Sequence, residues 1–145
     1  MRVRFLGTGG YHPNARRHTA CVLLPELGLA FDCGTSAFRL AEHVVPKRLQ
    51  VVLSHDHIDH ICGLTYLLVS LLTARWEQLA IYGTPETLTA VRTHLFDKAI
   101  FPVLLDQVTF HELPEQLVMG DVTIRHTALS HPGGCRGFRL DRANG

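Results

Sequence analysis

The chain has 145 residues, of which 46% are hydrophobic and 19% charged, a composition typical of one soluble globular domain and unlike a disordered chain. A formal net charge of +1 excludes a protein that binds nucleic acid through global basic charge. Arg16-Arg17-His18 is a candidate for a local basic patch near the N-terminus. The four cysteines form no Cys-x-x-Cys pair, and the N-terminus lacks the apolar core of a signal peptide. We therefore expect a cytoplasmic protein with reduced thiols.

The longest apolar stretch, residues 61–74, has the length of one buried helix and is too short to cross a bilayer. We therefore expect no membrane partner. The alternative for this stretch is a helix that lies at a membrane interface.

In chain order, short apolar runs predict strands at residues 3–6, 19–24 and 29–32, separated by turns at residues 7–10 and 25–28. A short helix follows over Ser36–Val45, because Pro46 cannot continue it. Residues 49–54 predict a fully buried strand, and His60–Arg75 a mostly buried helix.

The second half continues with a strand at residues 79–83 and a helix at residues 84–96, for which Thr84 is the expected cap. Three strands follow, at residues 107–113, 122–130 and 137–140, with a hairpin turn at Gly120-Asp121. Strands thus cluster, alternate with helices and cluster again. This order favours a single α/β domain over residues 1–145, with a mixed sheet and helices on its outer face.

The segment "SHDHIDH", residues 54–60, carries three histidines and two aspartates between the predicted strand and helix. In an extended segment, His55 and His57 emerge on one side, so both imidazoles can reach one metal ion. Asp59 and His60 can point to a second ion. Nitrogen and oxygen ligands suit zinc, or manganese or iron where carboxylates and water dominate. The alternative is a polar loop capped by Asp59, but three histidines at this spacing favour metal binding.

"SHDHIDHICGL" resembles the H-x-H-x-D-H signature of the metallo-β-lactamase fold superfamily. "RFLGTGG", "ARRHTACVLL" and "LAFDCGT" resemble the opening of its ribonuclease Z and phosphodiesterase branch, and "LSHPGGCRGFRL" a later segment there. The resemblance implies an α/β fold, the metallo-β-lactamase-like αββα sandwich.

The same resemblance implies roles for individual residues. One metal would be held by His55, His57 and His131, and the other by Asp59 and His60. Asp59 would also orient the attacking water or take its proton, while Asp32 would support the loop without binding metal. The complete fold would hold two zinc ions, with manganese or iron as alternatives.

The chain departs from the family pattern after His131, where neither the bridging aspartate nor the last histidine follows. We therefore expect roughly the first half of the sandwich, with strands for mainly one sheet and a weak second metal site. Its inner face would expose Val52, Leu53, Leu23 and Phe31. Because an exposed apolar face usually marks an interface, we expect a homodimer or association with a separate C-terminal half that covers it.

The leading functional hypothesis is an enzyme, a hydrolase that cleaves phosphodiester bonds in RNA or a cyclic nucleotide by attack of metal-bound hydroxide. The same metal centre could instead hydrolyse a thioester, lactone or lactam. The alternative from another class of function is a half-domain that binds metal but has no catalytic activity.

Overall fold

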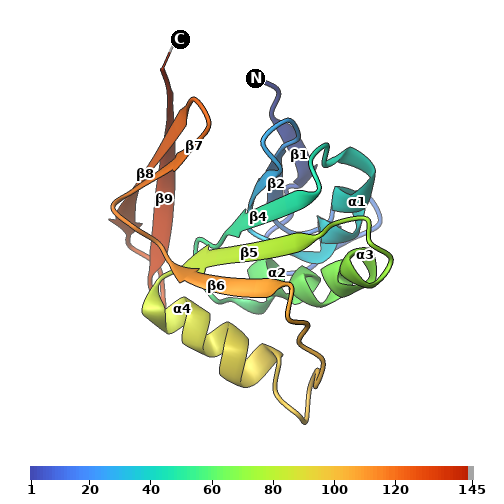
Figure 1. Ribbon diagram of the computed structural model, residues 1–145. Coiled ribbons are helices and arrows are strands. Elements are labelled where there is room, and N and C mark those ends of the chain that lie inside the picture. The colour runs from blue at the N-terminus through green and yellow to red at the C-terminus, as the bar shows by residue number, and fades with distance from the viewer. Residues whose placement is uncertain (144–145) are drawn as a thin grey trace.

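The computed structural model describes residues 1–143, which form three layers: helices, a six-stranded sheet and a three-stranded sheet (Figure 1). The larger sheet has the order β1-β2-β3-β4-β5-β6. The first three strands pair antiparallel, and β3 to β6 pair parallel. This arrangement confirms the predicted mixed sheet. The strands are β1 (Arg4–Gly7), β2 (Cys21–Leu24), β3 (Leu29–Phe31), β4 (Arg48–Val52), β5 (Gln78–Gly83) and β6 (Val108–Glu112).

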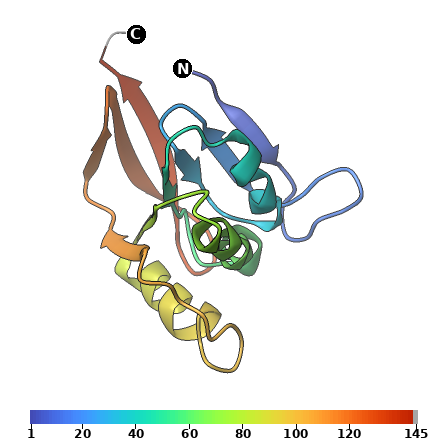
Figure 2. The same ribbon diagram turned by 45° about the vertical axis from the view of Figure 1, so that its right-hand side comes forward.

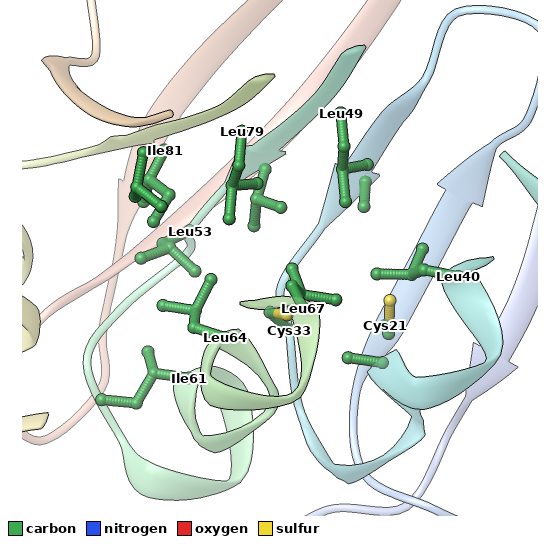
Figure 3. Close-up of a cluster of buried hydrophobic side chains, with 14 of the residues drawn as sticks. Cys21, Cys33, Leu40, Leu49, Leu53, Ile61, Leu64, Leu67, Leu79 and Ile81 are labelled. Carbon is green, nitrogen blue, oxygen red and sulfur yellow. The ribbon is translucent and has the colours of Figure 1, made fainter. Parts of the chain in front are cut away.

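Helical segments cover one face of the larger sheet (Figure 2). Leu64 and Leu67 pack against strand residues such as Leu49 and Leu79, and all four are nearly inaccessible to solvent (Figure 3). This layer confirms the expected helices on the outer face. The segments are the 3₁₀ turns η1 (Thr35–Arg39) and η2 (Cys62–Leu67), the α-helices α1 (Leu40–His43), α2 (Ile58–Ile61), α3 (Leu68–Leu72) and α4 (Pro85–Ala90), and the π-helical turn η3 (Val91–Leu95).

Two helix ends follow the sequence signals closely. The Thr84 side chain accepts a hydrogen bond from the Thr87 amide, and Pro85 occupies the first turn of α4. The helix predicted over Ser36–Val45 divides into η1 and α1 and ends at His43, since Val44 is already extended two residues before Pro46. None of the helices within residues 1–143 is long and apolar enough to cross a bilayer.

The predicted helix over His60–Arg75 is wrong as one continuous element, because it divides into α2, η2 and α3. The Gly63 amide donates to the Cys33 carbonyl at 2.8 Å, instead of to a carbonyl one turn earlier. The His60 carbonyl in turn accepts from the Cys33 amide at 2.7 Å. Bonds to the loop after β3 therefore replace helical bonds at the point where the helix changes type.

The smaller sheet has the order β7-β8-β9, with β7 (Gln116–Met119), β8 (Val122–Leu129) and β9 (Cys135–Arg142). The expected turn at Gly120-Asp121 joins β7 to β8, while β7 itself was not predicted. This sheet packs on the face of the larger sheet that the helices leave free. The resulting second core consists of Leu24, Leu29, Phe31, Val52, Met119, Val122 and Ile124.

The predicted exposed apolar face is wrong. Leu23 and Leu53 belong to the core beneath the helices, because neighbouring residues of a strand point to opposite faces. Val52 and Phe31 do face inward, but β7 to β9 cover them. All four side chains are buried. This face is therefore not free to drive association with a partner, and the oligomeric state stays a prediction.

The close contact between Gly63 and the loop after β3 can be tested by measuring how a larger side chain at Gly63 changes stability. A Cβ atom at Gly63 would lie 2.2 Å from the Gly34 carbonyl oxygen and 2.5 Å from the Ala37 Cβ. We expect Gly63→Ala to lower the free energy of unfolding by about 1–3 kcal/mol, the usual effect of overpacking. Gly10→Ala is the matched control, since no heavy atom lies within 4 Å of its added Cβ. Urea unfolding measures both, and equal stability of the two variants would contradict this packing.

Candidate metal centre

Three histidines from two distant segments converge at one edge of the larger sheet. His55 and His57 follow β4, and His57 keeps an extended backbone (φ −62°, ψ 143°) before α2 begins. Their ring centroids lie 4.6 Å apart. The turn between β8 and β9 brings the His131 ring to 4.7 Å from that of His55 and 4.9 Å from that of His57. One nitrogen of each ring lies within 4.8 Å of the other two.

The spacing of these nitrogens fits one transition-metal ion. His131 Nε2 lies 3.2 Å from His57 Nδ1. Two ligands at the usual zinc–nitrogen distance and tetrahedral angle would be separated by roughly 3.3 Å. His55 is buried, whereas His57 and His131 are exposed. The three donors thus form a cluster with one side open to solvent.

Asp59 and His60 lie beside this cluster, in the first turn of α2. The His60 ring centroid is 4.1 Å from that of His55, and His60 Nε2 is 3.4 Å from Asp59 Oδ2. The same carboxylate oxygen accepts a hydrogen bond from the Tyr11 amide at 2.8 Å. The five residues expected to hold metal are therefore brought together, with Asp59 and His60 outside the group of three imidazoles.

Asp32 links the end of β4 to α2. Its carboxylate accepts hydrogen bonds from the Ser54 amide (2.8 Å), the Ser54 hydroxyl (2.9 Å) and His60 Nδ1 (2.8 Å). These bonds confirm that Asp32 supports the loop. Its backbone is left-handed (φ 57°), a conformation that aspartate tolerates better than most residues.

This network also fixes the protonation of His55. The Ser54 hydroxyl has one hydrogen, which it donates to Asp32, so toward His55 Nδ1 (2.9 Å) it can only accept. His55 Nδ1 therefore carries the proton, and its Nε2 keeps a free lone pair. His60 Nδ1 likewise donates to Asp32, and its Nε2 faces the Asp59 carboxylate at 3.4 Å. The His55 ring is thus the one prepared to bind a metal through Nε2.

Burial and neighbouring charges shift the pKa values of His55 and His60 in opposite directions. Desolvation, and then the nearby His60, lower the pKa of His55. For His60 burial acts in the same direction, but its hydrogen bond to Asp32 and the charges of Asp32 and Asp59 raise the pKa overall. The ring in the three-histidine cluster is therefore the one that favours its neutral, metal-binding form.

Other candidates stay outside the cluster. His18 Nδ1 lies 3.3 Å from the Thr35 hydroxyl, and its ring contacts Phe38. Cys62 and Cys135 are half-buried free thiols. Sequence reasoning missed Tyr11, whose amide holds Asp59 from 48 positions away, because no local pattern signals such a contact. It also passed over Ser54, although this residue directly precedes His55.

The fold and the three-histidine cluster define a protein with a metallo-β-lactamase fold. The sequence profile of the β-lactamase superfamily domain matches residues 29–145. The chain belongs to this superfamily.

Its relatives include ribonuclease BN of Erwinia tasmaniensis, 32% identical over 97% of this chain and 49% of the relative. Ribonuclease Z of Treponema pallidum is 34% identical over 97% and 48%. The chain thus spans about half the length of these curated relatives. The metallo-β-lactamase fold protein YhfI from Bacillus subtilis is similar in structure, with a TM-score of 0.78, 24% identity, and coverage of 98% of this chain and 58% of that one. This structural likeness supports the fold alone.

The role of Asp32 generates a second prediction. Asp32→Asn keeps the side-chain shape and tolerates the left-handed backbone, but it removes the charge that three donors share. We expect the free energy of unfolding to fall by about 1.5–3 kcal/mol, the range for hydrogen bonds to charged groups. Asp106→Asn, at an exposed position, is the control. Chemical unfolding checks both, and a variant as stable as the control would show that this network contributes little.

Proposed function

We propose that this chain forms the metal-binding part of a hydrolase that cleaves phosphodiester bonds in RNA or a cyclic nucleotide. The main support for this proposal is the convergence of the imidazoles of His55, His57 and His131 on one point. The ribonuclease BN and ribonuclease Z names of its relatives support phosphodiesters as the substrate class. We infer zinc as the metal, because three nitrogen donors with an open side are typical of catalytic zinc sites.

In this proposal His55, His57 and His131 hold the metal, and Asp59 and His60 contribute to a second position beside it. Bound metal would supply Lewis acidity toward the phosphoryl oxygen and lower the pKa of water. The exposed rings of His57 and His131 leave that side accessible to a substrate. The buried network behind His55 prevents its ring from turning away.

Asp59 is the residue that would orient water and take a proton. Its Oδ2 is held by the Tyr11 amide and lies against His60. Its Oδ1 accepts no hydrogen bond from any side chain or amide within residues 1–143, so this oxygen is available as an acceptor. A carboxylate fixed through one oxygen and open at the other suits a general base.

Metal binding is tested by calorimetric titration with zinc. We expect His57→Ala to weaken zinc binding by at least about 100-fold, since loss of a ligand should exceed the 10–100-fold typical of its supporting contacts. His94→Ala is the matched control, because His94 is exposed on η3. A wild-type chain that binds no zinc, or a His57→Ala chain that binds it equally, would refute the site.

Activity is tested with bis(p-nitrophenyl) phosphate and a nitrophenyl thioester in parallel, with and without zinc. We expect only slow zinc-dependent cleavage of the phosphodiester, because Asp59 and His60 alone hold the second metal position weakly. Asp59→Asn should lower this activity by about 100-fold or more, as for removal of a general base. Asp97→Asn on the surface should retain activity. Cleavage of the thioester alone would favour the alternative hydrolase. Zinc binding without cleavage of either compound would favour the non-catalytic metal-binding module.

A further inference from the structure

Tyr11 has a backbone conformation that large residues rarely adopt. Its φ is 67°, and the His12 amide donates to the Gly10 carbonyl at 2.8 Å, so that this hydrogen bond closes around Tyr11. A bond between residues two apart, around a central residue of positive φ, forms the rarer and more strained kind of γ-turn. Glycine adopts positive φ readily, whereas a bulky side chain does so only under strain. The turn would therefore be more relaxed with glycine in place of Tyr11.

The Tyr11 side chain does not offset this strain by packing within the chain. The residue is 84% exposed, the highest value among the large apolar residues in the described range 1–143. It belongs to neither hydrophobic core, and the only aromatic ring that it meets in that range is His12, at a centroid distance of 5.4 Å. A strained residue that the fold does not need indicates a functional role. The role of Tyr11 then lies in what its exposed ring contacts outside the chain.

The turn lies at the edge of the larger sheet that carries the candidate metal centre. β1 is antiparallel to β2, β2 is antiparallel to β3, and β3 is parallel to β4. β1 and β4 therefore run in the same direction, and the loops that follow them leave the sheet at one edge. The first loop carries Tyr11, and the second carries His55 and His57.

One hydrogen bond fixes Tyr11 beside the second metal position. Its amide donates to Asp59 Oδ2 at 2.8 Å, and the same oxygen lies 3.4 Å from His60 Nε2. Because an N–Cα bond measures about 1.46 Å, the Tyr11 Cα lies within roughly 4.3 Å of this oxygen. The oxygen that Tyr11 contacts is thus the one that faces the His60 imidazole. The backbone that carries the ring therefore lies on the ligand side of Asp59 and not behind it.

A tyrosine ring in this position suits a planar partner. Its faces stack on aromatic and heteroaromatic rings, and this stacking depends little on the identity of the partner ring. The hydrogen bonds of the Tyr11 and His12 amides hold the backbone that carries the ring. A ring on a fixed backbone loses less conformational freedom when a ligand binds. A flexible alkyl group offers no flat surface for the same contact.

We propose that the Tyr11 ring stacks on a planar aromatic group joined to a phosphate bound at the metal centre. Tyr11 is then a specificity-determining residue, which favours aryl esters of phosphate over alkyl esters and takes no part in the proton transfer assigned to Asp59. The inference rests on the proposed function, which supplies the position of the phosphate. It adds a contact that neither the histidines nor Asp59 provide.

Calorimetric titration of the zinc-loaded chain with phenyl phosphate and methyl phosphate tests this contact. The two compounds carry the same phosphate and differ in the attached group. We expect phenyl phosphate to bind about tenfold more tightly, within the range for stacking of one ring on an aromatic side chain. Tyr11→Gly should reduce this ratio to within about twofold, because glycine keeps the amide that donates to Asp59 and only the ring is lost.

Two further variants separate the ring from other causes. Tyr11→Phe keeps the ring without the hydroxyl and should keep the tenfold ratio. Phe5→Ala removes another exposed ring, from β1, and should also keep it. Equal binding of the two compounds, no binding of either, a ratio that survives Tyr11→Gly, or a ratio lost in Tyr11→Phe would each overturn the stacking contact.

Urea unfolding of Tyr11→Gly tests the strain without any ligand. Since glycine adopts positive φ readily, we expect the unfolding midpoint to stay unchanged or to rise. A clear fall would show that the ring supports the fold, which would contradict a role outside the chain.

The outcomes separate this inference from the proposed function. A binding ratio lost in Tyr11→Gly would support the stacking contact even if bis(p-nitrophenyl) phosphate were not cleaved. Cleavage of that compound together with equal binding of phenyl and methyl phosphate would support the proposed function and overturn the stacking contact.

Discussion

The candidate site depends on one carboxylate, that of Asp32. It accepts three hydrogen bonds from two segments that would otherwise be independent, the end of β4 and the first turn of α2. Through Ser54 it fixes the tautomer of His55, and directly it fixes that of His60. A partly buried carboxylate with three donors is both strongly held and costly to remove. The orientation of the two rings is therefore settled by the fold itself.

The close packing around Asp32 is made possible by glycine. Gly34 and Gly63 allow the loop after β3 to touch the helical segment that follows the histidines, where any Cβ would meet backbone atoms. The same contact interrupts the helix that the sequence predicts. The irregularity of α2, η2 and α3 is thus a consequence of bringing Asp32 against His60.

Local sequence patterns were sufficient to predict much of the fold. Alternation, turn residues and caps identified most strands, the α4 helix and the hairpin turn at Gly120, because each depends on neighbours in the chain. The spacing of His55, His57, Asp59 and His60 predicted one half of the candidate site for the same reason. His131 could be assigned only through a resemblance, since its approach requires the β8–β9 turn to fold over the larger sheet.

The failures have a common origin in long-range contacts. The exposed apolar face was predicted because β7 was missed and because Leu23 and Leu53 were assigned to the wrong side of their segments. The amide of Tyr11 and the hydroxyl of Ser54 act through partners that spacing does not reveal. Contacts of this kind determine which atoms of the site are free to bind a ligand.

In the proposed site, three histidines present defined nitrogens to one metal ion. Nitrogen-15 NMR of the imidazole rings, recorded before and after addition of zinc, tests this arrangement most directly. The hydrogen bonds predict that zinc shifts Nε2 of His55, Nδ1 of His57 and Nε2 of His131, while Nδ1 of His55 keeps its proton. Binding through Nδ1 of His55, or a His131 ring unchanged by zinc, would show that these three nitrogens do not form the metal site.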